Sequence, residues 1–268
     1  MESVSEALTE AARRQPDLAS YYELHRKLLE LQEQAKREIE VTLELADEEA
    51  LLARTLQGLA LISFPQLPVE AARFAGLAVD LAQVLVEYGV EVGERTLPSD
   101  DAAWLSLAHQ RFEMGQVTGE QELEETATAL AAMAADLALI PYLEWAAEQV
   151  APHVAQESWK RGYCPVCGGA PDLATLEEES GARQLVCVRC NSCWLYDRVG
   201  CPFCGTTDHS QVVYYLSQDE VYRLYVCRAC RRYLKTIDRR KTGRTLLPPV
   251  ERLTTVAMDA AARQAGYR

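Results

Sequence analysis

The chain has 268 residues, 49% of them hydrophobic, and a formal net charge of −13, so it can form one large globular domain or two smaller ones. The acidic balance opposes a nucleic-acid partner, because phosphates repel carboxylates. The N-terminal segment lacks the apolar stretch of a signal peptide, and Arg13-Arg14 lacks that of a twin-arginine export signal. The most apolar window, 127–143, contains Asp136 and a proline, so we expect no membrane span and a cytoplasmic protein.

The first 158 residues are predicted to form an acidic helical domain, since they hold 29 acidic and 10 basic side chains and no cysteine. In the segment 17–40, Leu24, Leu28 and Leu31 recur at helical spacing. The apolar stripes predict a bundle core, and no catalytic constellation is visible. Further helices are expected over 67–89, over 98–112 with Ser99 as N-cap, and over 118–139 with a Thr118/Gln121 capping box.

The composition changes after residue 158. Residues 159–268 hold 11 acidic and 17 basic side chains and all nine cysteines. Short runs rich in Val, Tyr and Leu alternate with Gly, Pro and Asp turns, which predicts strands in place of helices. Eight cysteines form four C-x-x-C pairs: Cys164/Cys167, Cys187/Cys190, Cys201/Cys204 and Cys227/Cys230.

The spacing of these pairs predicts two metal sites. A C-x-x-C turn presents two sulfurs to one ion, and a hairpin of about twenty residues brings a second turn to complete a tetrahedron. The phrases CPVCG and RQLVCVRC return as CPFCG and RLYVCRAC, so the chain contains two copies of one module. We therefore expect all eight paired cysteines to be ligands of two ions, and four thiolates suit zinc and iron equally.

Three features leave alternatives open. Disulfides and thioredoxin-like chemistry are not expected, because cytosolic thiols are kept reduced and the redox motif needs one C-x-x-C in a βαβ setting. Cys193, the ninth cysteine, is a spare thiol, an alternative ligand or a small apolar residue beside Trp194. The basic run 231–244 either binds nucleic acid or forms a solvated hairpin surface or a dock for the acidic helical domain.

The residues around the cysteines resemble those of the formate dehydrogenase accessory protein family (FdhE). The similarity runs from Gly162 onward and includes YCPVCGGAP, LVCVRC, GCPFCG, YVCRACRRYLKTIDRR and VERLTTVAMDAAARQAGYR. The resemblance implies a cytoplasmic factor that binds the catalytic subunit of a respiratory formate dehydrogenase and promotes its maturation or activity before export. It also implies rubredoxin-like tetrathiolate sites associated with iron, whose positions the eight paired cysteines match and Cys193 does not.

The expected architecture is α+β. It comprises a helical domain (1–158), two tandem rubredoxin-like or zinc-ribbon β modules (159–199 and 200–248) and a C-terminal helix (249–268). Metal is expected to hold the modules folded while the surface binds the client, so we do not expect an enzyme. Electron transfer by rubredoxin-type iron and nucleic-acid binding by zinc ribbons remain alternative functions. The native metal, the residues that contact the client and the oligomeric state do not follow from the sequence.

Overall fold

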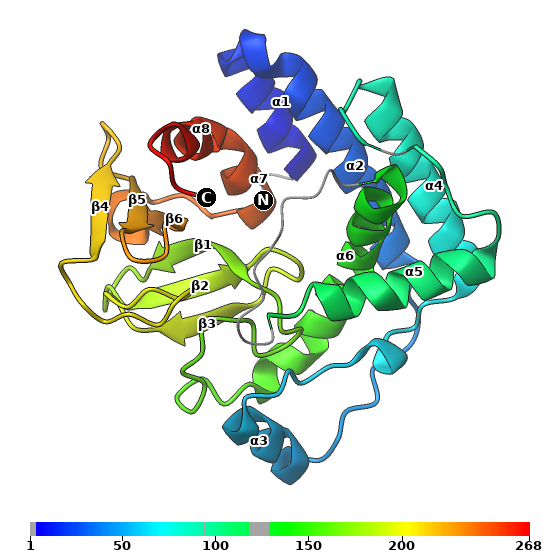
Figure 1. Cartoon of the computed structure of the whole chain (residues 1–268), viewed down its shortest axis with the longest axis horizontal. Helices are drawn as coiled ribbons and strands as arrows, with labels where there is room; N and C mark the ends of the chain where they lie inside the picture. Colours follow the sequence, from blue (N-terminus) through cyan, green and yellow to red (C-terminus); the bar gives the residue numbers. More distant parts are fainter. Residues whose placement is uncertain (1–3, 94, 118–128) are drawn as a thin grey trace. The chain divides into compact units, whose positions relative to one another are not determined.

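The structure, a computed structural model, describes residues 4–93, 95–117 and 129–268, and the chain divides into two compact units (Figure 1). The first unit comprises Met1–Leu45 and Ile62–Gln149, and the second comprises Ala46–Leu61 and Val150–Arg268. The division into four parts at 158, 199 and 248 stays a prediction. The contacts add the segment 46–61 to the unit that holds the cysteines.

The first unit is helical, as predicted. The helices that the structure describes in this unit are α1 (Val4–Arg14), α2 (Ala19–Arg37), α4 (Ala71–Glu87), α5 (Asp101–Met114) and α6 (Leu130–Val150), with short 3-10 helices η1 (Pro16–Leu18) and η2 (Phe64–Gln66). 

 

The large buried side chains include Tyr22 of α2, Phe74 of α4, and Trp104 and Phe112 of α5. Helix α1 packs on α2, α2 on α4, and α4 on α5, so apolar faces predicted from the sequence meet in one core.

The expected N-cap of α5 is wrong by one residue. The carboxylate of Asp100 accepts a hydrogen bond from the Ala103 amide at 2.9 Å, so Asp100 and not Ser99 caps the helix. Both residue types are good caps, and the backbone places the Asp100 side chain over the first free amides. The predicted capping box of Thr118 and Gln121 lies outside the described residues.

Helix α6 is the most apolar helix of the described chain. The segment Leu130–His153 has a mean hydropathy of 1.3 and is long and apolar enough to cross a membrane, but 67% of that window is buried. The core helix of a soluble protein passes the same test, so this segment is weak support for a membrane span. Asp136 of α6 forms an ion pair with Arg111 of α5, in which Nε and Oδ1 are 2.9 Å apart.

The strands of the second unit form one six-stranded sheet in the order β3-β2-β1-β6-β5-β4. β1 to β3 pair antiparallel in one half, β4 to β6 do so in the other, and β1 pairs parallel with β6 between them. The repeated modules are therefore joined by backbone hydrogen bonds into one sheet. The strands are β1 (Pro171–Leu176), β2 (Arg183–Cys187), β3 (Cys193–Tyr196), β4 (Val212–Leu216), β5 (Tyr222–Cys227) and β6 (Tyr233–Asp238).

Two helices follow β6 where the sequence predicted one. They are α7 (Pro248–Thr254) and α8 (Val256–Gln264), and Figure 1 shows them beside the strands. Ala262 of α8 packs with Leu224 and Val226 of β5 in a buried apolar cluster. Lys235 of β6 forms an ion pair with Asp259 of α8 at 2.7 Å, which fixes the helix on this face. The second unit also contains α3 (Glu48–Gln57) and the 3-10 helices η3 (Ala151–His153) and η4 (Arg239–Lys241).

Candidate metal centres

The eight paired cysteines lie in two groups of four, as the spacing predicted. Within each group all four sulfurs lie within 4.8 Å of one another. Each group joins the C-x-x-C turn that precedes a hairpin to the C-x-x-C turn that follows the same hairpin. Each repeat therefore builds its own group. Cluster 1 consists of Cys164, Cys167, Cys187 and Cys190, and cluster 2 consists of Cys201, Cys204, Cys227 and Cys230.

The four turns share one backbone geometry. In each, the amide of the residue after the second cysteine donates to the carbonyl of the first cysteine, at 2.9 to 3.2 Å. That residue has a positive φ, which favours glycine, and two of the four positions are glycine. This repeated turn directs both sulfurs of a pair to the same side. The residues with positive φ are Gly168 (75°), Asn191 (56°), Gly205 (71°) and Arg231 (61°).

The C-terminal residues hold the fourth turn, where Arg231 adopts the left-handed conformation. Its guanidinium donates to the carbonyls of Ala265 at 3.2 Å and Gly266 at 3.3 Å, and lies 4.4 Å from the ring centroid of Tyr267. The amide of Arg268 donates to the Arg231 carbonyl at 2.8 Å. The closing Gly266-Tyr267 segment, part of the family resemblance, therefore stabilises a turn of cluster 2.

The distances between sulfurs suit a tetrahedral metal ion. They are 3.5 Å for Cys167 and Cys187, 3.6 Å for Cys164 and Cys190, and 3.7 Å for two pairs in cluster 2. Four bonds of about 2.3 Å to one ion place tetrahedral sulfurs about 3.8 Å apart, whereas a disulfide requires about 2.05 Å. Each cluster could therefore hold one ion, and the four-sulfur donor set suits zinc or iron.

Protons compete with a metal ion for these sulfurs. Burial raises the pKa of Cys201, and it raises the pKa of Cys230 to about 11. The backbone amides of Cys204 and Phe203 act in the opposite direction on the pKa of Cys201. Without a metal ion these two sulfurs are thiols at neutral pH, so an ion that binds them must displace protons.

The two clusters differ in burial. All four cysteines of cluster 1 are buried, whereas in cluster 2 Cys204 is exposed and Cys230 is half-buried. The segment 46–61 contributes to the cover of cluster 1, because the Leu61 amide donates to the Pro165 carbonyl at 2.9 Å. The Tyr163 hydroxyl also donates to the Gly58 carbonyl at 2.9 Å. Sequence reasoning assigned this segment to the helical domain and did not predict its contact with a cysteine turn.

The segment before the first turn of cluster 1 lies against the first turn of cluster 2. A Cβ atom on Gly162 would lie 1.8 Å from the carbonyl oxygen of Pro202, so a side chain at residue 162 has no room. The Trp194 indole donates to the Arg161 carbonyl at 3.0 Å and holds the same segment. The segment just before the first C-P-x-C phrase therefore packs against the backbone of the second phrase.

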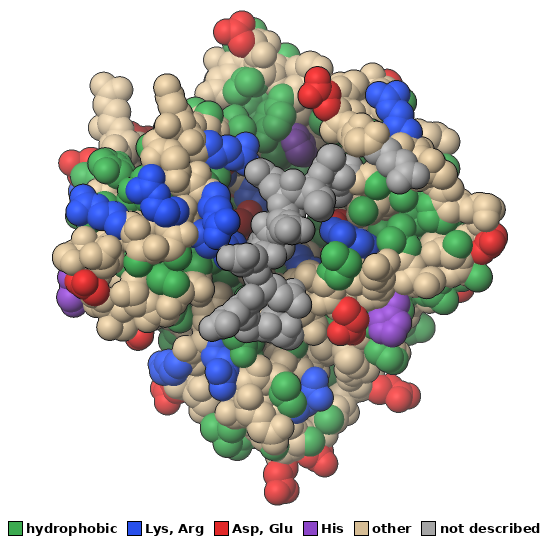
Figure 2. Space-filling model, viewed as in Figure 1, with side chains coloured by type: hydrophobic (Ala, Val, Ile, Leu, Met, Phe, Trp, Pro, Cys, Tyr) green, Lys and Arg blue, Asp and Glu red, His purple; other side chains and the backbone are tan. Residues whose placement is uncertain are grey.

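Two sequence features lie outside the clusters. Cys193 begins β3 and is exposed, and its sulfur lies 3.7 Å from the carbonyl oxygen of Asn191. Figure 2 shows Lys and Arg side chains on the molecular surface. Much of the charge of the basic run 231–244 is neutralised, which lowers its attraction for phosphates. Its ion pairs are Lys235 with Asp259, Arg240 with Asp238, Lys241 with Glu220 and Arg244 with Glu251.

Sequence reasoning missed two arginines that contact the cysteine turns. Arg183 donates to the carbonyl of Gly200, directly before Cys201, and Arg252 donates to the carbonyl of Cys187 at 2.7 Å. One signal was present in the sequence for Arg183. In both repeats an arginine lies four residues before a turn cysteine, in the pattern R-x-x-x-C. Residue type alone does not show what such an arginine contacts.

The sequence is similar to curated proteins named FdhE or FdhE homolog. The chain is 36% identical over 115 residues to a protein FdhE homolog of Aquifex aeolicus, covering 41% of this chain and 40% of that one. It is 31% identical over 172 residues to the protein FdhE of Salmonella paratyphi A, covering 55% and 52%. The chain thus matches about half the length of these curated relatives or less, and no protein-family model matches it.

A solved structure shares the fold. The crystal structure of the FdhE protein from Pseudomonas aeruginosa aligns with a TM-score of 0.63 and covers 99% of this chain and 91% of that one. The sequence identity over this alignment is 19%, so the likeness concerns the fold.

Proposed function

We propose that the chain is an accessory factor for a formate dehydrogenase, because it is 36% and 31% identical to FdhE proteins over about half of its length. In this proposal it acts in the cytoplasm and binds the catalytic subunit of a respiratory formate dehydrogenase. It promotes the assembly or activity of that subunit before export. The role is one of binding and not of catalysis.

The eight paired cysteines, in this proposal, hold two metal ions that keep the sheet folded. The observation that carries it is the pair of four-sulfur groups with distances of 3.5 to 3.7 Å. Small β modules gain little stability from buried area, and a structural ion contributes on the order of 10 kcal/mol to folding. The metal thus stabilises the surface that binds the client.

Affinity purification tests this function. A tagged chain isolated without oxygen from its own cells should carry two metal ions and copurify with the catalytic subunit of a formate dehydrogenase. The conservative variant Arg228→Lys, changed at an exposed residue of the fourth turn, is purified in parallel as a control for the procedure. It should carry the same two ions and the same partner. Capture of DNA or RNA without the subunit would favour the zinc-ribbon alternative and contradict the proposal.

Electron transfer is the second candidate function. The exposure of Cys204 favours it, because an iron ion in cluster 2 would lie near the surface and could exchange electrons with a partner. Zinc has no redox chemistry, so the zinc-loaded chain separates the two roles. If it binds the client and restores formate dehydrogenase activity in cells that lack the natural protein, electron transfer is not required.

A further inference from the structure

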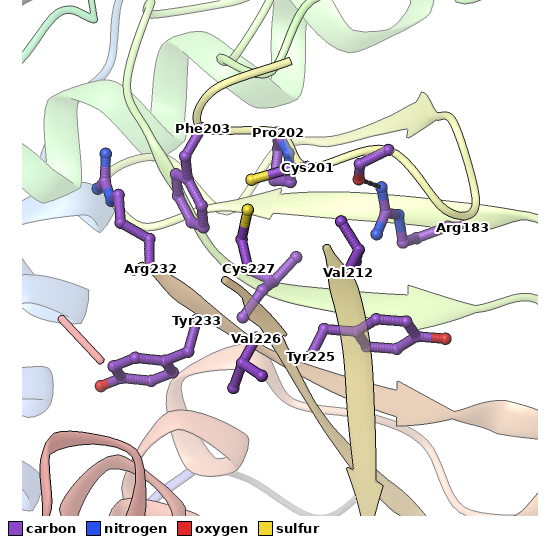
Figure 3. A pocket seen from close by; sticks show the side chains of 12 residues that line it. Arg183, Cys201, Pro202, Phe203, Val212, Tyr225, Val226, Cys227, Arg232 and Tyr233 are labelled. Atoms are coloured by element: carbon purple, nitrogen blue, oxygen red, sulfur yellow. Dashed lines mark hydrogen bonds between the residues drawn. The ribbon is translucent and has the colours of Figure 1, made fainter. Parts of the chain in front are cut away.

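Strand β2 connects the two clusters. Its last residue, Cys187, belongs to cluster 1, and its first residue, Arg183, has 1% of its surface exposed. The Arg183 guanidinium donates to the carbonyls of Asp197 and Gly200, and Gly200 directly precedes Cys201 of cluster 2. The dashed line in Figure 3 marks a hydrogen bond of Arg183, which lies in the same pocket as Cys201 and Cys227.

A second residue of the first module supports the same turn. The hydroxyl of Tyr196, on β3, donates to the Cys201 carbonyl at 3.1 Å. The Arg183 guanidinium carbon lies 5.3 Å from the Tyr196 ring centroid and 5.9 Å from that of Tyr225. The first module therefore holds the backbone on which Cys201 is mounted.

The charge of Arg183 also suits a filled cluster 2. Within the described residues this buried guanidinium forms no salt bridge, and its Nε has no hydrogen-bond partner. An unpaired buried cation is unfavourable unless an anion lies near. Four thiolates around a divalent ion carry a net charge of about −2, so a filled cluster 2 supplies that anion.

The internal repeat provides a comparison. Arg223 holds the position in β5 that Arg183 holds in β2, four residues before the turn cysteine. Arg223 pairs with the fully buried carboxylate of Asp238 at 2.6 Å. The arginine at this position of the repeat thus contacts a carboxylate in the second repeat and a cysteine turn in the first.

We propose that Arg183 is a positioning residue that couples the two clusters, so that an ion in cluster 1 raises the affinity of cluster 2 for its own ion. This inference rests on the proposed metal binding. An ion on Cys187 orders β2, and ordered β2 places Arg183 against the turn of Cys201. Coupling between two sites is reciprocal, so an ion in cluster 2 favours the filling of cluster 1.

A contact in the other direction supports this coupling. Arg252 of α7, which follows the second module, donates to the Cys187 carbonyl at 2.7 Å and pairs with Asp172 at 2.6 Å. Each cluster therefore has a turn whose backbone is held by an arginine from outside its own module.

Titration of the reduced, metal-free full chain with cadmium tests the coupling. Cadmium NMR gives a signal for each filled thiolate site, and the pairs Cys164→Ser/Cys167→Ser and Cys204→Ser/Cys230→Ser assign the signals. In Arg183→Gln, cluster 2 should need at least tenfold more free cadmium when cluster 1 is filled, and the two clusters should fill independently of each other. Arg183→Lys, which keeps the cation, should recover part of the affinity, and Tyr196→Phe should cause a smaller loss at cluster 2.

Arg223→Gln is the matched control: any loss of stability that it causes should not lower the cadmium affinity of cluster 2 relative to that of cluster 1. An unchanged cadmium affinity of cluster 2 in Arg183→Gln, or an equal effect of Arg223→Gln on that affinity, would overturn the proposal. Independent filling of the two clusters in the natural chain would also overturn it while leaving the metal sites intact. Failure of cadmium to bind either cluster would instead contradict the proposed metal-binding function.

Discussion

Clusters 1 and 2 arise from the same repeat but have different surroundings. Their turns share one hydrogen-bond pattern, yet cluster 1 is fully buried and cluster 2 exposes Cys204. Cluster 1 is covered by the segment 46–61 and contacted by Arg252, which come from distant parts of the chain. The comparison teaches that the repeat determines the arrangement of the cysteines, whereas residues outside it determine how far solvent reaches them.

Removal of a cysteine pair should have the largest effect. Cys164→Ser with Cys167→Ser should lose one ion and destabilise the second unit on the order of 10 kcal/mol, because the buried cluster 1 then lacks its metal. Cys204→Ser with Cys230→Ser should also lose one ion but retain more protease resistance. Metal analysis and limited proteolysis measure both effects. Cys193→Ser is the control and should keep two ions; loss of one would identify Cys193 as a ligand.

Asp238→Asn removes the buried carboxylate that pairs with Arg223, the repeat arginine of the second module. The Asp238 carboxylate is fully buried and pairs with Arg223 and Arg240, both at 2.6 Å. Loss of one partner of a buried pair costs about 4 kcal/mol, and urea unfolding of the metal-loaded chain measures it. Glu220→Gln removes an exposed partner of Lys241 and should change stability by less than about 1 kcal/mol. Equal effects of the two changes would contradict the role of Asp238.

Gly162→Ala tests the contact between the segment before cluster 1 and the first turn of cluster 2. The new methyl group would overlap the Pro202 carbonyl, and overpacking of this kind should cost about 3 kcal/mol in the free energy of unfolding. Gly243→Ala is the control, since a Cβ there has open space, and it should change stability by no more than about 0.5 kcal/mol. Unfolding that is no easier for Gly162→Ala would show that the two turns do not need this contact.

The rate of metal removal should show the smallest difference. A chelator should extract the ion of cluster 2 about tenfold faster than that of cluster 1, which equals about 1.4 kcal/mol in barrier height. Cys204 is exposed, whereas cluster 1 opens only when its cover moves. Release should accelerate as the pH falls, because burial raises the pKa of Cys230 and protons then compete for its sulfur. Release at a single rate from both clusters would remove the distinction drawn from burial.

The local features of the molecule were predictable from short stretches of sequence. The C-x-x-C spacing predicted which cysteines share a cluster, and the glycines after Cys167 and Cys204 agree with turns that need a positive φ. The apolar periodicity of 17–40 predicted α2, because a helix buries residues that recur every three or four positions. These features depend on residues close together in the chain.

The remaining features depend on contacts between distant residues, which no local pattern encodes. The R-x-x-x-C repeat did not distinguish Arg183, which contacts the turn of cluster 2, from Arg223, which contacts Asp238. Likewise, the parallel pairing of β1 with β6 joins two modules that looked separate, because strand partners are chosen by packing on both faces of the sheet. The sequence by itself determined the two groups of four cysteines and their local turns; only the tertiary structure decided what covers each cluster and what connects them.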